Sequence, residues 1–232
     1  MIEIIRSAER GHFNYGWLDT NHTFSFGDYI NPTRNQFRSL RVLNEDRVQP
    51  GEGFPSHPHR EMEIITYVVD GALSHRDSLG NTSLTSRDEV QVISAGAGIT
   101  HSEFNDSYQT PVHFLQIWIR PNGAGLTPSY QHLAFPENEK RGQLRLICSP
   151  TQEAGSAMVH QDVLMYGSIL GAGESILHRL TTERFGWVQV VSGELDLLTQ
   201  QLSAGDGAAI IQETDLVIKA STESEFLLFD LG

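Results

Sequence analysis

Short apolar runs, each about as long as a β-strand, recur along the whole chain. They are rich in β-branched and aromatic residues and are bounded by Gly, Pro, Asn and Asp, which favours strands over helices. Examples are residues 64–69, 90–93, 113–119, 187–191 and 226–229. Helical periodicity is almost absent. The pattern therefore predicts an all-β protein of the sandwich or barrel type.

A second pattern is a long-range repeat of strand and turn signals. Residues 68–73 read VVDGAL and residues 190–195 read VVSGEL, while LTSRD at 84–88 is answered by LSAGD at 202–206. A repeat of this length predicts two domains of similar construction rather than a solenoid of short units. Because residues 121–143 contain linker-like segments, we expect one domain over residues 1–125 and another over residues 140–232.

Composition and charge narrow the function classes. The 232 residues are 39% hydrophobic and 19% charged, as in ordinary globular proteins. We find neither a membrane-length apolar stretch nor a leader peptide, so we expect no membrane association and a cytoplasmic location. A net charge of −13 repels phosphate backbones, which disfavours direct nucleic-acid binding and leaves protein partners open. The single Cys148 is expected to be a buried apolar residue.

Candidate chemistry gathers in the first half of the chain. His57 and His59 stand two residues apart, so in a strand both side chains leave the same face. His101 and Glu103 repeat this spacing, and Glu63 continues the face of the first pair, so on geometry alone either carboxylate can complete a shell with the three imidazoles. That shell suits one divalent transition metal, with Fe(II) expected ahead of Ni, Cu, Mn or Zn. Other histidines, such as His75, are expected to be core or surface residues.

These motifs resemble the two metal motifs of the cupin superfamily and, in finer detail, the pirin family. The cupin likeness rests on Gly51, His57-Pro58-His59, Glu63 and Gly71, then on Gly96, Gly98, His101 and Asn105. The pirin likeness adds the runs at residues 23–29, 41–51, 57–63, 94–103 and 115–118. The resemblance implies a bicupin, with two jelly-roll β-barrels in tandem and one metal in the N-terminal barrel.

The pirin resemblance also implies a ligand set and an activity. In pirins the carboxylate ligand is the Glu two residues after the third His, which implies the metal ligands His57, His59, His101 and Glu103. Glu63 then orients a histidine or forms an ion pair. Some pirins are similar to quercetin 2,3-dioxygenases, which implies an oxidoreductase acting on a small aromatic substrate and O₂, with Glu103 as the base. The alternative is a metal-containing regulatory protein that acts through protein partners.

The second half of the chain lacks a comparable set of ligands. With the repeat offsets of 122 and 118, the four candidate ligands align with Arg179, Thr181, Lys219 and Ser221. Neighbouring His178 stands alone. We therefore expect the C-terminal barrel to be structural and free of metal.

Overall fold

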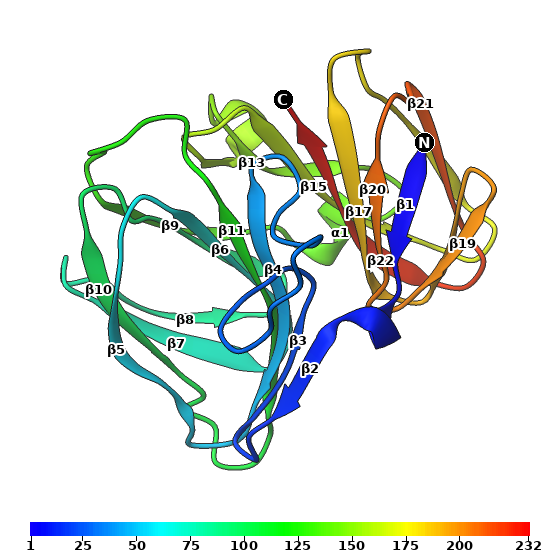
Figure 1. Ribbon diagram of the computed structural model, residues 1–232. Helices are drawn as coiled ribbons and strands as arrows, with labels where there is room; N and C mark the ends of the chain where they lie inside the picture. The colour runs from blue at the N-terminus through cyan, green and yellow to red at the C-terminus, as the bar shows by residue number, and fades with distance from the viewer. The chain divides into compact units, whose positions relative to one another are not determined.

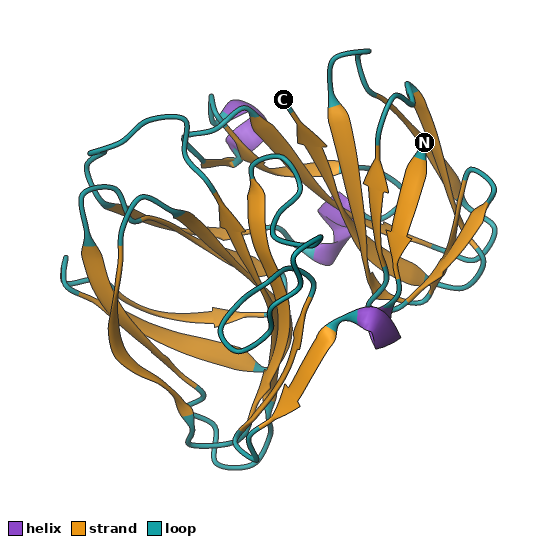
Figure 2. Ribbon diagram, viewed as in Figure 1, coloured by secondary structure: helices purple, strands orange, loops and turns teal.

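The computed structural model describes residues 1–232 and consists almost entirely of β-structure (Figures 1 and 2). Helix is limited to α1 (Glu137–Lys140) and two 3-10 turns at Ser7–Glu9 and Glu153–Gly155. None of these has the length and apolar character needed to cross a bilayer. The all-β prediction is thus confirmed. The chain divides into an N-terminal unit, Gly11–Ala134 with Ala157–Gln161, and a C-terminal unit made of the other residues.

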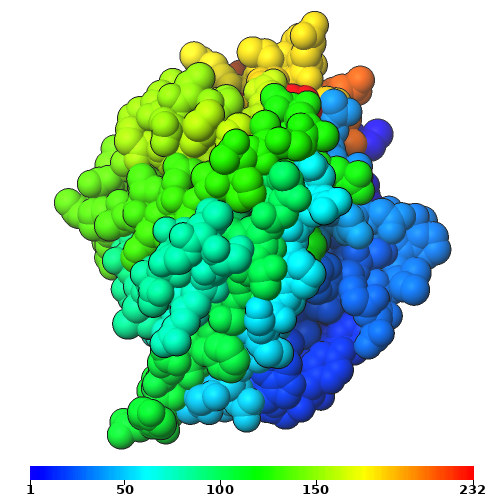
Figure 3. Space-filling model, turned by 90° about the vertical axis from the view of Figure 1, so that its left-hand side faces the viewer, coloured from blue at the N-terminus to red at the C-terminus, as the bar shows by residue number.

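The N-terminal unit consists of two antiparallel sheets. The larger sheet has the order β12 (Ser129–Ala134), β9 (Glu89–Ser94), β6 (Glu63–Asp70), β11 (Val112–Ile119), β4 (Leu40–Val48), β3 (Leu18–His22) and β2 (Gly11–Asn14). The smaller has the order β5 (Gly53–His59), β10 (Ile99–Phe104), β7 (Ala72–Asp77) and β8 (Thr82–Ser86). In Figure 3, the green segment of β10 lies between cyan β5 and the teal atoms of β7 and β8. The short β14 (Ala157–Met158) also belongs to this unit.

Apolar side chains from both sheets fill the interior of the N-terminal unit. Leu73 of β7 packs in one buried cluster with Val68 and Phe114 of the larger sheet. Burial alternates along β10, where Ile99, His101 and Glu103 are buried and their neighbours are partly exposed. This period of two means that one face of β10 points into the unit. The same inward face therefore carries two of the candidate ligands.

The C-terminal unit has the same two-sheet plan. One sheet has the order β1 (Ile2–Ile5), β20 (Gly207–Ile210), β17 (Phe185–Ser192), β22 (Ser224–Leu231), β15 (Val163–Leu170) and β13 (Arg145–Ser149). The other has the order β16 (Ser175–Arg179), β21 (Asp215–Ala220), β18 (Glu194–Leu197) and β19 (Gln200–Ser203). Strand β1 pairs with β20, with Ile2 opposite Ile210. Residues 1–10 therefore cluster with this unit, whereas the predicted first domain includes them.

The repeated sequence segments adopt the same local structure. Gly71 lies between β6 and β7 with φ of +77°, and Gly193 lies between β17 and β18 with φ of +81°. Glycine is favoured at both turns because a side chain is strained at positive φ. A Cβ at position 193 would also lie 2.3 Å from the carbonyl oxygen of Glu223. The two units thus share a strand–glycine–strand step that the sequence repeat predicts.

Candidate metal centre

Three histidines meet because β5 and β10 pair in the register that the centre needs. His57 lies opposite His101, and His59 lies opposite Ile99. Strand β5 is at the edge of its sheet, which is where Pro55 and Pro58 can be accommodated without a missing ladder bond inside the sheet. All three imidazoles therefore project from one face, and their ligating nitrogens lie within 4.8 Å of one another.

The orientation of the His57 ring is set by its second nitrogen. Nδ1 of His57 donates to the carbonyl oxygen of Pro55 over 2.8 Å, which leaves the lone pair on Nε2. That Nε2 lies 3.0 Å from Nε2 of His101. Burial, reinforced by the charge of His57, lowers the pKa of His59 to about 4. Burial, with repulsion from the neighbouring histidines, lowers the pKa of His101 to about 3.

This arrangement fits a divalent transition metal. Metal binding requires neutral imidazoles, and the low pKa values of His59 and His101 keep both rings neutral near pH 7. Two nitrogens 3.0 Å apart need a cation or a shared proton between them. Three nitrogen donors around one point supply half of an octahedral shell or most of a tetrahedral one. The cluster therefore has the donor set for one transition-metal ion.

Glu103 lies beside the three histidines but forms part of a second group. One of its carboxylate oxygens lies within 4.8 Å of ring nitrogens of His75 and His101. The carboxylate accepts hydrogen bonds from Nε2 of Gln91 at 2.7 Å and from Nε2 of Gln116 at 3.1 Å. Burial raises the pKa of Glu103 to about 7, against the opposing effect of these hydrogen bonds. The structure thus holds this carboxylate firmly, with a proton affinity suited to exchange near neutral pH.

Glu63, the other carboxylate that the sequence left open, lies outside both groups. It is fully buried, and its Oε1 accepts a hydrogen bond from the Ser94 hydroxyl at 2.8 Å. Its Oε2 accepts the backbone N–H of His160 at 3.2 Å and lies 3.3 Å from Nδ1 of that histidine. These contacts give Glu63 a buried hydrogen-bonding role beside His160.

His75 and Asp77 were not expected at this site. Both side chains are fully buried, and Nε2 of His75 lies 3.0 Å from Oδ2 of Asp77. Nδ1 of His75 lies 3.4 Å from Nδ1 of His101, and the ring of Tyr130 stacks on His75 at 4.7 Å. The available signal was the spacing, because His75-Arg76-Asp77 is a third pair of polar residues two apart on a strand.

A cavity of about 70 Å³ opens onto the centre. Its walls combine histidines, carboxylates and amides with three aromatic rings, from Phe26, Asn44, Asp46, Phe54, His57, His59, Glu103, Gln116 and Trp118. Oδ1 of Asn44 and Nε1 of Trp118 are buried without a hydrogen-bond partner. Buried polar atoms are normally paired, so these two are available to a bound molecule.

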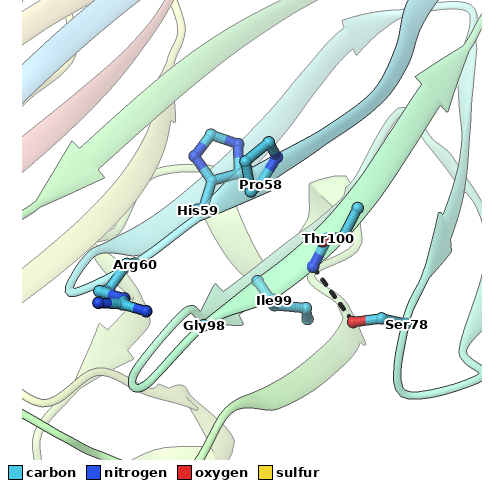
Figure 4. Close-up of a pocket in the computed structure, with 7 residues that line it drawn as sticks. All are labelled: Pro58, His59, Arg60, Ser78, Gly98, Ile99 and Thr100. Atoms are coloured by element: carbon cyan, nitrogen blue, oxygen red, sulfur yellow. Dashed lines mark hydrogen bonds between the residues drawn. The ribbon is translucent and has the colours of Figure 1, made fainter.

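A larger hollow lies nearby on the outer surface of the small sheet (Figure 4). It has a volume of about 390 Å³, and its lining includes Pro58, His59, Thr100 and Ser78, whose hydroxyl accepts the Thr100 N–H at 3.1 Å. Pro58 and Thr100 alternate along their strands with the three clustered histidines, so their side chains leave the opposite face. Because His59 of the cluster also lines this hollow, the hollow adjoins the centre.

Comparison with known proteins places the chain in a family. Residues 5–119 match the family model described as Pirin, and residues 146–231 match the Quercetinase C-terminal cupin domain. The chain is 43% identical to quercetin 2,3-dioxygenase of Escherichia coli K12, and the alignment covers 100% of this chain and 99% of that protein. A pirin-like protein of Caulobacter vibrioides is 38% identical, with 95% of each chain covered. The chain belongs to the pirin family. The resemblance found in the sequence is confirmed.

A solved structure supports the same placement. The bacterial pirin YhhW of Escherichia coli, in complex with nickel(II), superposes with a TM-score of 0.96 at 43% identity, covering 100% of this chain and 99% of that one. The predicted bicupin architecture of this pirin is thereby confirmed. In the C-terminal unit, His178 pairs with Asp230 at 2.9 Å, whereas both groups of candidate metal ligands lie in the N-terminal unit.

Proposed function

We propose that this pirin is a metal-dependent dioxygenase that opens the ring of flavonols such as quercetin with O₂. The observation that carries the proposal is the three-histidine cluster with Glu103 at a cavity that aromatic side chains line. Likeness over the full chain to a quercetin 2,3-dioxygenase supports the substrate class. We place the reaction in the N-terminal domain, proposed as residues 1–125. The C-terminal domain, proposed as residues 140–232, is proposed to hold no metal.

The proposed ligands are His57, His59, His101 and Glu103. Three neutral nitrogens and one carboxylate leave positions open for substrate and O₂ on an ion that prefers five or six ligands. Fe(II) is the metal proposed for this chain, with Ni(II) as its main competitor, because a related pirin binds nickel. Elemental analysis of protein purified without chelators identifies the metal. One ion per chain is expected, and a second ion would contradict the vacant C-terminal domain.

His101→Ala is expected to abolish tight metal binding. The variant removes one of three nitrogen donors, so the loss of affinity should exceed the roughly 10- to 100-fold typical of losing an outer hydrogen-bond partner. Titration of the apoprotein with Co(II), followed by its visible absorbance, measures the effect. His113→Ala is a matched control, because His113 pairs with Glu45 at 2.9 Å and belongs to neither ligand group. Equal metal affinity in both variants would contradict the assignment.

Glu103 is placed to accept the proton of a phenolic substrate. Burial raises the pKa of this carboxyl above its ordinary value, which makes the carboxylate a stronger proton acceptor than an exposed one. The amides of Gln91 and Gln116 each donate to one of its oxygens, which holds the carboxylate in a fixed orientation. A divalent ion bound by the histidines would lower the pKa of a hydroxyl group that reaches it. The residues thus favour a flavonolate, the electron-rich form that reacts with O₂.

The remaining wall residues suit a flat hydroxylated ring. Asn44 offers a free carbonyl oxygen and Trp118 a free indole N–H, which can pair with hydroxyl and carbonyl groups. The rings of Phe26 and Trp118 contact each other edge to face at 5.3 Å and supply apolar surface. Sites for molecules of this size typically have volumes of about 300–1,000 Å³. Since the cavity is about 70 Å³, entry of a flavonol requires movement of aromatic wall residues.

A flavonol with a free 3-hydroxyl is expected to react, whereas the analogue lacking that hydroxyl should not. Only this hydroxyl can give the anion that O₂ attacks. Anaerobic mixing of metal-loaded protein with quercetin should red-shift the ligand's absorbance, because deprotonation extends conjugation, and admission of air should then consume O₂. The matched ligand is the flavone that differs only at position 3. If quercetin gives neither the shift nor O₂ uptake, the dioxygenase proposal is wrong and the regulatory alternative replaces it.

Two further points stay proposals. We place the protein in the cytoplasm, in keeping with its single cysteine, which is buried and forms no disulfide. A pull-down that captures a protein with the metal-loaded chain, but not with a variant that lacks the metal ligands, would favour a protein partner. The proposed reaction itself needs no protein partner.

A further inference from the structure

Beyond the proposed ligands, a buried chain of polar side chains leads away from the centre along β10 and β7. The pairing of these strands sets Asp77 opposite His101 and His75 opposite Glu103, so all four side chains share one face. Asp77 contacts His75 at 3.0 Å, and His75 contacts His101 at 3.4 Å. The side chains of His75 and Asp77 are fully buried. The contacts therefore connect a carboxylate to a proposed metal ligand through a second histidine.

Asp77 acts only as an acceptor in this chain. Its Oδ1 accepts the backbone N–H groups of Leu79 at 2.9 Å and Asn81 at 3.0 Å, and both oxygens accept from the Asn81 amide. Burial raises the pKa of Asp77, but the hydrogen bonds from His75, Asn81 and Leu79 outweigh it and leave a net lowered pKa. An ionised carboxylate at this point requires the proton of His75 to sit on Nε2.

The position of the His75 proton determines where the proton of His101 must lie. With Nε2–H directed at Asp77, a neutral His75 presents its Nδ1 lone pair to His101. His101 must then carry its own proton on Nδ1, which leaves the lone pair on Nε2. That Nε2 is the atom 3.0 Å from Nε2 of His57, inside the cluster of three histidines. Each step follows from the donors and acceptors present, and the chain allows one tautomer for each ring.

We propose that Asp77 and His75 are positioning residues that fix the tautomer of His101, so that its Nε2 lone pair faces the metal. The inference rests on the proposed metal centre and adds two residues to it. Histidine ligands commonly donate their other N–H to a carboxylate or carbonyl group, and such partners raise metal affinity. Here a second histidine lies between the ligand and the carboxylate. Tyr130, stacked on His75, holds that ring in place.

Asp77→Asn is the decisive variant because it preserves shape and reverses the hydrogen bond to His75, with loss of the bond that Oδ2 accepts from the Asn81 amide. Three donors fix the side-chain oxygen of the new Asn at the place of Oδ1, so its NH₂ group faces Nε2 of His75. His75 must then protonate on Nδ1 and set an N–H against the N–H of His101. We expect Zn(II) affinity to fall about 10- to 100-fold. His75→Phe, which retains a flat ring against Tyr130, should lose a similar amount.

Tautomers give a readout that a merely structural role would not change. In Zn(II)-loaded protein with ¹⁵N-labelled histidine, we expect wild-type His75 to be protonated on Nε2, and His75 of the Asp77→Asn variant on Nδ1. The control is His178→Phe, which removes another histidine paired with an aspartate, the half-buried His178 beside Asp230 at 2.9 Å in the C-terminal unit. It should lower thermal stability and leave Zn(II) affinity unchanged.

The outcomes separate the two proposals. If wild-type protein binds Zn(II) without shifting the ¹⁵N signals of the three clustered histidines, the metal centre itself is wrong. If those signals shift but wild-type His75 is protonated on Nδ1, the centre stands and the positioning role is overturned. The same holds if Asp77→Asn binds Zn(II) as tightly as the wild-type protein.

Discussion

Glu103→Gln is expected to lower flavonol turnover by about 10²- to 10⁴-fold while the protein still binds metal, which is the usual contribution of a positioned general base. Glutamine keeps an oxygen that can ligate, but it cannot accept the substrate proton near neutral pH. Burial raises the pKa of the native carboxyl, which strengthens it as a proton acceptor. Single-turnover kinetics with quercetin, normalised to metal content, measures the loss.

Hydrogen bonding around position 103 supplies an internal control. In Glu103→Gln, the new amide N–H₂ faces an amide donor, from either Gln91 or Gln116, so one hydrogen bond is lost. The double variant Glu103→Gln with Gln91→Glu restores a donor–acceptor pair at the same place. It should regain the thermal stability of the native protein without regaining turnover. Recovery of turnover in the double variant would show that the proton acceptor need not be at residue 103.

Glu63→Gln tests the choice between the two carboxylates. Ser94 and His160 hold Glu63 outside both ligand groups, and glutamine can still accept the Ser94 hydrogen bond. Metal content and turnover should therefore stay within a few-fold of the native values. If Glu63→Gln loses metal and Glu103→Gln keeps both metal and activity, the carboxylate ligand is Glu63.

The fold was largely predictable because strand signals are local. Alternation, turn glycines and the VVDGAL and VVSGEL repeat depend on neighbouring residues, and each marks a strand pair in the structure, including the turns at Gly71 and Gly193. The pairing of β1 with β20 was not predictable, because Ile2 and Ile210 are far apart in sequence and nothing local specifies the partner. Tertiary contacts therefore decide that residues 1–10 belong to the C-terminal unit.

The centre was predictable where spacing alone determines which face a side chain takes. His57-x-His59 and His101-x-Glu103 share a face in any extended strand, and the structure brings the three histidines together. The contact of His75 with His101 depends instead on the register of β7 against β10, which a single sequence does not reveal. The same register brings Glu103 into one group with His75 and His101. Cross-strand register is therefore the information that sequence reasoning lacked.

Lys140→Met is expected to lower the free energy of unfolding of the C-terminal unit by about 3–5 kcal/mol, the usual cost of breaking a buried ion pair by removing one partner. Nζ of Lys140, at the end of α1, lies 3.3 Å from Oε1 of Glu225 in β22, and the two side chains are only 1% and 4% exposed. Removing the ammonium group takes away the countercharge that Lys140 provides to this buried carboxylate.

Replacing both partners tests whether the loss of unfolding free energy is electrostatic. Lys140→Met with Glu225→Leu removes both charges and keeps apolar volume, so most of the stability should return. Urea unfolding, followed by the fluorescence of Trp187 in a Trp17→Phe, Trp118→Phe background, reports on the C-terminal unit, where Trp187 is fully buried. Co(II) affinity should be unchanged in each variant, because the proposed ligands all belong to the N-terminal unit. If the double variant is as unstable as Lys140→Met, lost packing explains the effect, and if Co(II) affinity falls as well, the C-terminal unit contributes to the metal centre.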